Sequence, residues 1–134
     1  MKLYADEAEH AAVRELEALV VSAIAAVEVP AAIWRKQRLG ELSSEDAALL
    51  VRAFSADFHG TGSEPPRFAA VAIGMPILSR AATLVAAHAL RAYDAVQLAS
   101  ALAARAADPE CTGFACFDRA LRGAAAAEGF TPLP

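Results

Sequence analysis

The chain has 134 residues and a formal net charge of −4. This length is enough to bury a hydrophobic core, and we expect one domain over residues 1–134. The negative balance argues against nucleic-acid binding by overall charge, and two cysteines are too few for a disulfide framework or a zinc site. The apolar runs fall short of the roughly 20 residues of a membrane span, and no export signal is recognisable. We therefore expect a cytoplasmic protein with no membrane partner.

Short strands and helices alternate along the sequence. Compact apolar or β-branched runs predict four strands, at residues 19–22, 67–73, 112–117 and 130–133. Apolar residues at helical spacing predict helices within 10–19, over 23–39, from 44 past 54, over 76–89, from about 93 to 107, and from 118 to 129. Strands that alternate with helices favour right-handed crossovers and a parallel sheet covered on both faces. The sequence therefore predicts an α/β fold.

Local signals mark where several of these elements begin or end. Pro30 lacks a backbone donor, which predicts a kink in the helix over 23–39 or a helix start near Val29. Gly40 should end that helix, and Ser43 should cap the next one. Residues 60–66, rich in Gly, Ser and Pro, predict a loop.

Asp94 places a carboxylate on an apolar helix face. Read at helical pitch, it shares that face with Leu98, Ala101 and Leu102. Burying an ionised carboxylate is costly unless a cation or a hydrogen-bond donor meets it. Asp94 therefore requires a partner.

Two other acids, Glu28 and Asp118, lie in comparably apolar settings. Asp118 directly follows a predicted strand, Glu28 lies about one helical turn beyond another, and Asp94 opens its helix. Ligands of open α/β sheets gather outside the carboxyl ends of the strands, so these acids can converge there. Carboxylates without His or Cys partners suit Mg²⁺ or Mn²⁺. Such a site best supports hydrolysis at phosphorus.

Each acid also has a structural interpretation. Asp118 stands at a strand-to-helix junction, where aspartate is a favoured N-cap. Glu28 can pair with Arg35 or Lys36 on a solvated face. Asp94 can be a first-turn acid favoured by the helix dipole. In the same stretch, Tyr93 is expected in the core rather than stacked on a base.

Four stretches resemble a known family in matching order: Lys2-Leu3-Tyr4 with Asp6-Glu7, Val21-Ser22-Ala23 with Val27-Glu28-Val29, Leu90-Arg91-Ala92-Tyr93-Asp94-Ala95 with Gln97-Leu98-Ala99, and Phe117-Asp118-Arg119 with Leu121. Together they resemble PIN-domain ribonucleases of the VapC toxin type over nearly the whole chain. The stretch around Asp94 is the most specific of them.

The resemblance implies a PIN-like three-layer α/β/α sandwich with a short parallel sheet. It also implies a Mg²⁺- or Mn²⁺-dependent endoribonuclease that forms a homodimer and is inhibited by a cognate antitoxin protein. By position, Glu28, Asp94 and Asp118 match the acidic metal-site residues of that family. Ser22 and Arg91 match neighbouring positions to which we assign no role.

The sequence departs from the family at its start. Family members open with an apolar strand that ends in a metal-binding Asp, and by the family's topology this strand lies centrally in the sheet. Met1 stands about where the loop after that strand would be, so the fold is expected to lack the family's first strand. We expect such a strand and its Asp to be encoded just before the printed start, the alternative being a genuine truncation.

These observations give a leading hypothesis and two alternatives. The leading hypothesis is a toxin-type endoribonuclease in which Glu28, Asp94 and Asp118 hold one or two divalent ions and hydrolyse RNA. The first alternative is a catalytically impaired PIN-like remnant that acts as an antitoxin-binding or dimerisation module. The second is an ordinary α/β domain whose acids are caps and ion pairs.

Overall fold

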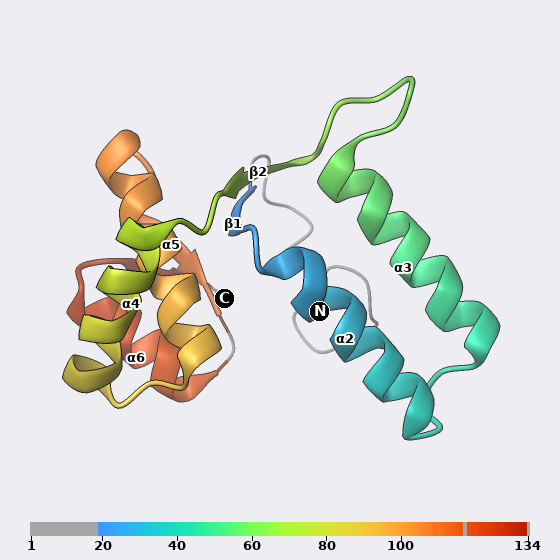
Figure 1. The fold of residues 1–134 in the computed structure, drawn as a ribbon, viewed down its shortest axis with the longest axis horizontal. Coiled ribbons are helices and arrows are strands. Elements are labelled where there is room, and N and C mark those ends of the chain that lie inside the picture. The colour runs from blue at the N-terminus through green and yellow to red at the C-terminus, as the bar shows by residue number, and fades with distance from the viewer. Residues whose placement is uncertain (1–18, 117, 134) are drawn as a thin grey trace. The chain divides into compact units, whose positions relative to one another are not determined.

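The computed structural model describes residues 19–116 and 118–133 (Figure 1). Its elements follow in the order β1 (Leu19–Ser22), α2 (Ala25–Arg38), α3 (Ser44–His59), β2 (Phe68–Val71), α4 (Met75–His88), α5 (Ala92–Ala107), β3 (Gly113–Ala115), α6 (Arg119–Ala127) and β4 (Thr131–Leu133). The four predicted strands and the helices that follow the first of them are confirmed, with shifted ends. The helix expected within 10–19 lies outside the described residues. The chain is of the α/β class.

The chain divides into two compact units, which are described separately. The first contains Leu19 and residues 25–69, and the second contains residues 20–24 and those from 70 onward. The expectation of one domain over 1–134 stays a prediction. No helix in the described part of the chain is long and apolar enough to cross a membrane.

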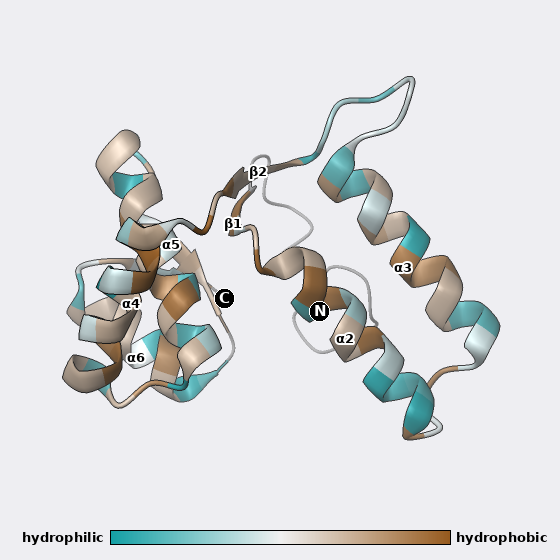
Figure 2. Ribbon diagram, in the orientation of Figure 1, coloured by the Kyte–Doolittle hydropathy of each residue, from teal (hydrophilic) through white to brown (hydrophobic). Residues whose placement is uncertain are grey.

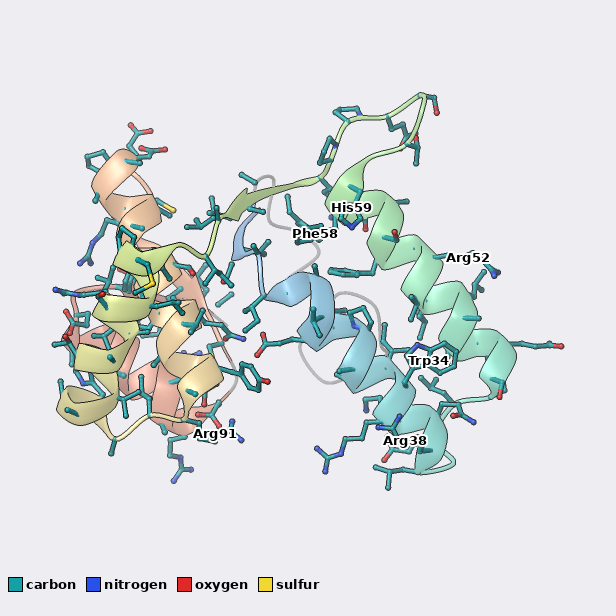
Figure 3. All side chains as sticks on the ribbon, in the orientation of Figure 1. Trp34, Arg38, Arg52, Phe58, His59 and Arg91 are labelled. Atoms are coloured by element: carbon teal, nitrogen blue, oxygen red, sulfur yellow. The ribbon has the colours of Figure 1, made fainter. Side chains whose placement is uncertain are left out.

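The first unit is built on a helical hairpin of α2 and α3, which lie side by side (Figure 1). Both helices alternate hydrophilic and hydrophobic segments, as Figure 2 shows. Ile33 and Ala47 are fully buried, and Trp34 is partly buried and faces α3 (Figure 3). Phe54, which is also buried, lies 5.5 Å from Phe58 between ring centroids. An apolar stripe on each helix therefore supplies the core of this unit.

Local capping decides where these helices end. Gly40 has φ +77°, its N–H donates to the Gln37 carbonyl, and the N–H of Glu41 donates to the Lys36 carbonyl. This pair of bonds is the Schellman arrangement, which favours glycine at the left-handed position. Ser43 Oγ then accepts a hydrogen bond of 3.0 Å from the Asp46 N–H at the start of α3. The expected terminator and cap are both confirmed.

Pro30 does not mark a helix start. Helix α2 begins at Ala25 and contains Pro30 in its interior, so the alternative start near Val29 is wrong. The missing donor removes only one intrahelical bond, and the packing of α2 against α3 offsets that loss.

The core of the second unit lies between α4, α5 and α6. Leu84, Leu98 and Leu121, one from each helix, are at most 1% exposed and belong to a single cluster of buried apolar side chains. Alanines at positions 95 and 99 of α5 are equally buried. Such small side chains let neighbouring helices approach closely. This packing fixes where the first turns of α5 and α6 lie.

The described strands form two pairs rather than one continuous sheet. β1 and β2 are hydrogen-bonded neighbours, and β3 and β4 are parallel with Gly113 opposite Thr131. The Ala23 N–H also donates to the Val71 carbonyl at 2.9 Å. Within the described residues no ladder joins the two pairs, so the single parallel sheet expected from the strand pattern is seen here only as separate pairs.

Candidate functional site

Asp94 lies in the first turn of α5 with its side chain largely buried. Arg91 is the N-cap residue of the helix and has extended backbone angles, so the helix begins at Ala92. The Asp94 side chain is only 14% exposed, and Leu98, one turn further on, is fully buried. The helical pattern therefore placed this carboxylate correctly on the apolar face. A carboxylate in this setting needs a partner.

The partner of Asp94 in the described structure is Arg91. Its Nε donates to Asp94 Oδ2 at 3.0 Å, and its Nη2 lies 3.9 Å from Asp118 Oδ2. One guanidinium thus faces two carboxylates, one in the first turn of α5 and one at the N-cap of α6. The Arg91 side chain is 79% exposed at the start of α5, where Figure 3 labels it.

Asp118 has two structural partners, one for each carboxylate oxygen. Its Oδ1 accepts a hydrogen bond of 2.9 Å from the Leu121 N–H, which makes Asp118 the N-cap of α6. Its Oδ2 faces Arg91. The capping interpretation is therefore confirmed. The Asp118 side chain is 45% exposed, and its Oδ2 faces the same Arg91 guanidinium that pairs with Asp94.

Cys116 lies beside Asp118, and the charge of Asp94 also acts on its thiol. The Asp118 N–H donates to its Sγ at 3.3 Å. Burial raises the pKa of the Cys116 thiol, and the negative charges of Asp118 and Asp94 raise it further. The thiol is therefore protonated at neutral pH and is a poor nucleophile. In the sequence, only its position two residues before Asp118 indicated that Cys116 lies near the site.

Glu28 belongs to the first unit, whereas Asp94 and Asp118 belong to the second. It lies in the first turn of α2 and is partly exposed. Lys36, one of the partners suggested for it, pairs with Glu41 at 3.2 Å. The structure thus brings together Asp94 and Asp118, and Glu28 as a third ligand stays a prediction.

Asp94 and Asp118 form a donor set that suits a hard divalent cation. In the described part of the chain, no group of three or more His, Cys, Asp or Glu side chains is arranged to hold a metal ion. Magnesium, however, is commonly held by one or two carboxylates while water and substrate phosphates fill its remaining positions. Two carboxylates that face one positive group fit this requirement.

Tyr93 is exposed, so its expected place in the core is wrong. Its side chain is 62% exposed, because successive helical residues point in directions about 100° apart and the neighbouring Asp94 takes the inward direction. Tyr93 and Arg91 therefore flank Asp94 in sequence as exposed side chains. An exposed aromatic ring can stack on a nucleobase.

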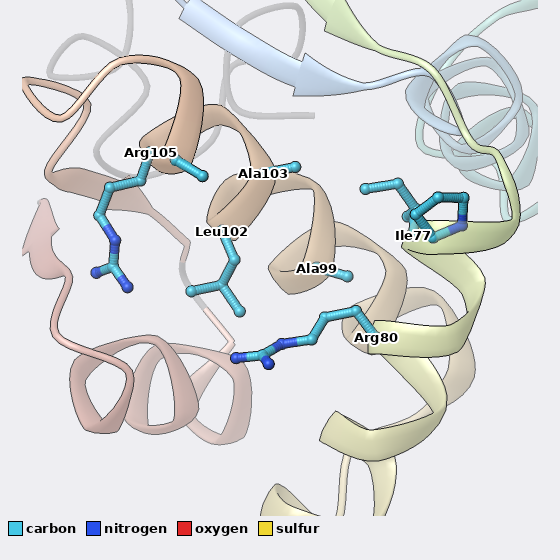
Figure 4. Close-up of a pocket in the computed structure, with 8 residues that line it drawn as sticks. Ile77, Arg80, Ala99, Leu102, Ala103 and Arg105 are labelled. Atoms are coloured by element: carbon cyan, nitrogen blue, oxygen red, sulfur yellow. The ribbon is translucent and has the colours of Figure 1, made fainter.

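A separate pocket of about 420 Å³ lies along the C-terminal half of α5 (Figure 4). Ile77, Ala99 and Leu102 contribute apolar lining, and Arg80 and Arg105 contribute positive charge. Both arginines have internal partners, since Arg80 lies 3.9 Å from Glu128 and Arg105 covers the ring of Phe130 at 4.3 Å. This pocket does not include the carboxylates of α5 and α6.

No model of a known protein family matches the chain, and no curated protein matches it. The resemblance to PIN-domain ribonucleases therefore stays a prediction.

Proposed function

We propose that the protein is a Mg²⁺- or Mn²⁺-dependent endoribonuclease, the toxin of a toxin–antitoxin pair, which hydrolyses RNA phosphodiester bonds. The observation that carries this proposal is the convergence of Asp94 and Asp118 on one cationic group. These residues lie 24 positions apart, Asp94 in the first turn of α5 and Asp118 at the N-cap of α6. Surface ion pairs are common, but an aspartate that is 14% exposed is not an ordinary surface residue.

The chemistry of the donor set supports phosphodiester hydrolysis. Asp94 and Asp118 would hold the divalent ion, with Glu28 proposed as a further ligand. When bound, the ion lowers the pKa of a water molecule and screens charge that develops on phosphorus. The protein's own contribution is to orient the carboxylates: Arg91 fixes Asp94 Oδ2, and the N–H of Leu121 fixes Asp118 Oδ1. Arg91 and Tyr93 offer exposed groups for the RNA.

The proposed architecture is a PIN-like three-layer α/β/α sandwich. The parallel register of β3 and β4 and the helices between the strands support it. In such a sheet, the strands on either side of the central strand would form two separate pairs once that strand is left out. The described residues show two pairs, β1 with β2 and β3 with β4. The homodimer and the cognate antitoxin are proposed partners because the resemblance to VapC-type toxins implies them.

Cleavage of RNA by the purified chain tests the nuclease function. We expect Mg²⁺- or Mn²⁺-dependent cleavage that is abolished by EDTA and by Asp94→Asn. Asp108→Asn is the matched control, because it removes an exposed acid at the other end of α5. Cleavage that survives EDTA, or that Asp94→Asn leaves intact, would overturn the proposal.

A PIN-like remnant that binds an antitoxin or a second copy is the alternative function. The pocket between α4 and α5 favours it, since its apolar lining and two arginines suit a protein partner better than hydrolysis. Calorimetric titration with Mn²⁺ separates the two functions. A remnant would show no uptake that depends on Asp94 and Asp118.

A further inference from the structure

We propose that the pocket between α4 and α5 is a docking site for a segment of a partner protein that carries a carboxylate next to an apolar side chain. Residues of α4 and of the C-terminal half of α5 line this pocket, and Asp94 and Asp118 are not among them. The inference therefore goes beyond the proposed cleavage of RNA and does not depend on it.

Small side chains on one face of α5 create the pocket. Ala99, Ala103 and Ala106 are spaced by four and three residues, so they share that face. Because each of these side chains ends at Cβ, a hollow of about 420 Å³ remains beside Ile77 and Arg80 of α4. Ala99 is only 1% exposed and forms its floor, whereas Ala106 is exposed at its edge. From Ala99 to Ala106 the helix rises roughly 10 Å, which is enough for a short segment of chain.

Two arginines add positive charge to this apolar hollow. Arg80 and Arg105 both line it, and Figure 4 shows Leu102 between their side chains. Arg80 lies 3.9 Å from Glu128, and Arg105 lies over the Phe130 ring at 4.3 Å from its centroid. In the described part of the chain, neither guanidinium donates a hydrogen bond. Both therefore keep N–H donors for a ligand.

Neither contact has to break when a carboxylate binds. An aromatic ring attracts a guanidinium through its face, which leaves N–H donors of Arg105 for a carboxylate. Glu128 offsets one of the two positive charges, and its other oxygen lies 2.9 Å from His88 Nε2. Two guanidinium groups and one carboxylate leave a local positive charge on a chain whose formal net charge is −4. The ligand that complements the pocket is therefore an anion.

The apolar lining determines which anion fits. RNA carries its charge on a polar sugar-phosphate backbone, which cannot cover Ile77 and Leu102 favourably. A carboxylate beside an apolar side chain matches both the arginines and this lining. The pocket is also open to solvent, whereas sites for small molecules enclose most of the ligand. A segment held by the fold of a partner protein therefore fits better than a free carboxylate.

Selection from a random peptide library displayed on phage tests the chemistry of the occupant. We expect the enriched peptides to place an aspartate or glutamate next to a large apolar residue. One enriched peptide, labelled with fluorescein, is then titrated with the protein and followed by anisotropy. Failure to enrich any peptide, or enrichment of peptides without an acid, would overturn the proposal.

Substitution of the arginines tests the charged half of the site. We expect Arg80→Gln and Arg105→Gln each to weaken binding of the labelled peptide about tenfold. Arg52→Gln is the matched control, because it removes an exposed arginine of α3 that does not line this pocket. Loss of Arg105 also removes the contact with Phe130, so the 53% exposed Arg80 gives the decisive comparison. Equal affinities of the Arg80 and Arg52 variants would overturn the role of the arginines.

Filling the hollow tests the apolar half. Ala106→Phe places a ring at the edge of the pocket and should weaken binding of the same peptide about tenfold. Ala107→Phe is the matched control, since Ala107 is the next exposed residue and does not line the pocket. Circular dichroism verifies that both variants are folded. Equal affinities of these two variants would place the peptide elsewhere and overturn the docking site.

Two competitors distinguish a protein segment from other anions. Octanoate joins a carboxylate to an apolar chain without a peptide backbone, and a single-stranded RNA oligonucleotide supplies phosphates. We expect neither to displace the labelled peptide at concentrations near the Kd of that peptide. Displacement by octanoate at that level would indicate a site for small carboxylates, and displacement by the oligonucleotide would indicate a nucleic-acid surface. Either result would overturn the protein partner.

Discussion

Substitution of Asp118 separates a structural role from a chemical one. Asp118→Ala removes both the capping bond to the Leu121 N–H and the charge that faces Arg91. Asp118→Asn removes the charge but keeps an oxygen that can cap, since asparagine and aspartate are comparable N-caps. If Asp118 acts only as a cap, only the alanine variant loses stability. If Asp118 is also a metal ligand, both variants lose the ion.

The loss of stability expected for Asp118→Ala follows from the two contacts that the substitution removes. Loss of an N-cap costs about 1 kcal/mol, and the 3.9 Å ion pair to a 79% exposed arginine adds at most a few tenths. We therefore expect a loss of about 1–1.5 kcal/mol in the free energy of unfolding. For a chain of 134 residues, this lowers Tm by roughly 3–6 °C. Asp118→Asn should cost less than about 0.5 kcal/mol.

Urea unfolding and Mn²⁺ calorimetry on the same preparations provide the measurement. Ser43→Ala serves as the control, because Ser43 caps α3 through a comparable 3.0 Å bond and lies outside the site. It should lose about as much stability as Asp118→Ala, about 1 kcal/mol, and bind Mn²⁺ normally. Full Mn²⁺ affinity in Asp118→Asn would refute the ligand role, and unchanged stability in Asp118→Ala would refute the cap.

Further predictions concern the core, one turn and one thiol. Leu98→Ala, at a fully buried position, should cost about 2–5 kcal/mol in urea unfolding, and Leu49→Ala, at an exposed one, less than about 1. Gly60→Ala should lower Tm more than Gly40→Ala: both have positive φ, but only at Gly60 does an added Cβ meet backbone, at 2.9 Å from the Glu64 carbonyl oxygen. In a Cys111→Ser background, Cys116 should react with iodoacetamide at pH 8 more slowly in the folded than in the urea-unfolded protein, because its raised pKa keeps it protonated; equal rates would contradict the burial.

Much of the fold could be predicted from local patterns. The Schellman bonds after Gly40, the cap at Ser43 and the cap at Asp118 join residues only a few positions apart, so composition around each junction determines them. The apolar face of α5 follows from spacing in the same way, including the inward direction of Asp94. Strand positions could be predicted as well, but the pairing of strands could not, since ladders join segments distant in sequence.

The sequence by itself determined that Asp94 needs a partner, because an ionised carboxylate on a buried helix face is unstable alone. Arg91 and Asp94 are three residues apart, so their pairing is local, and only the tertiary structure decided that Asp118 faces the same guanidinium. It also decided that Cys116 lies beside Asp118. The physical reason is that the place of Asp118 depends on how α5 and α6 pack in one core that contains Leu98 and Leu121, and such packing joins side chains that no local spacing relates.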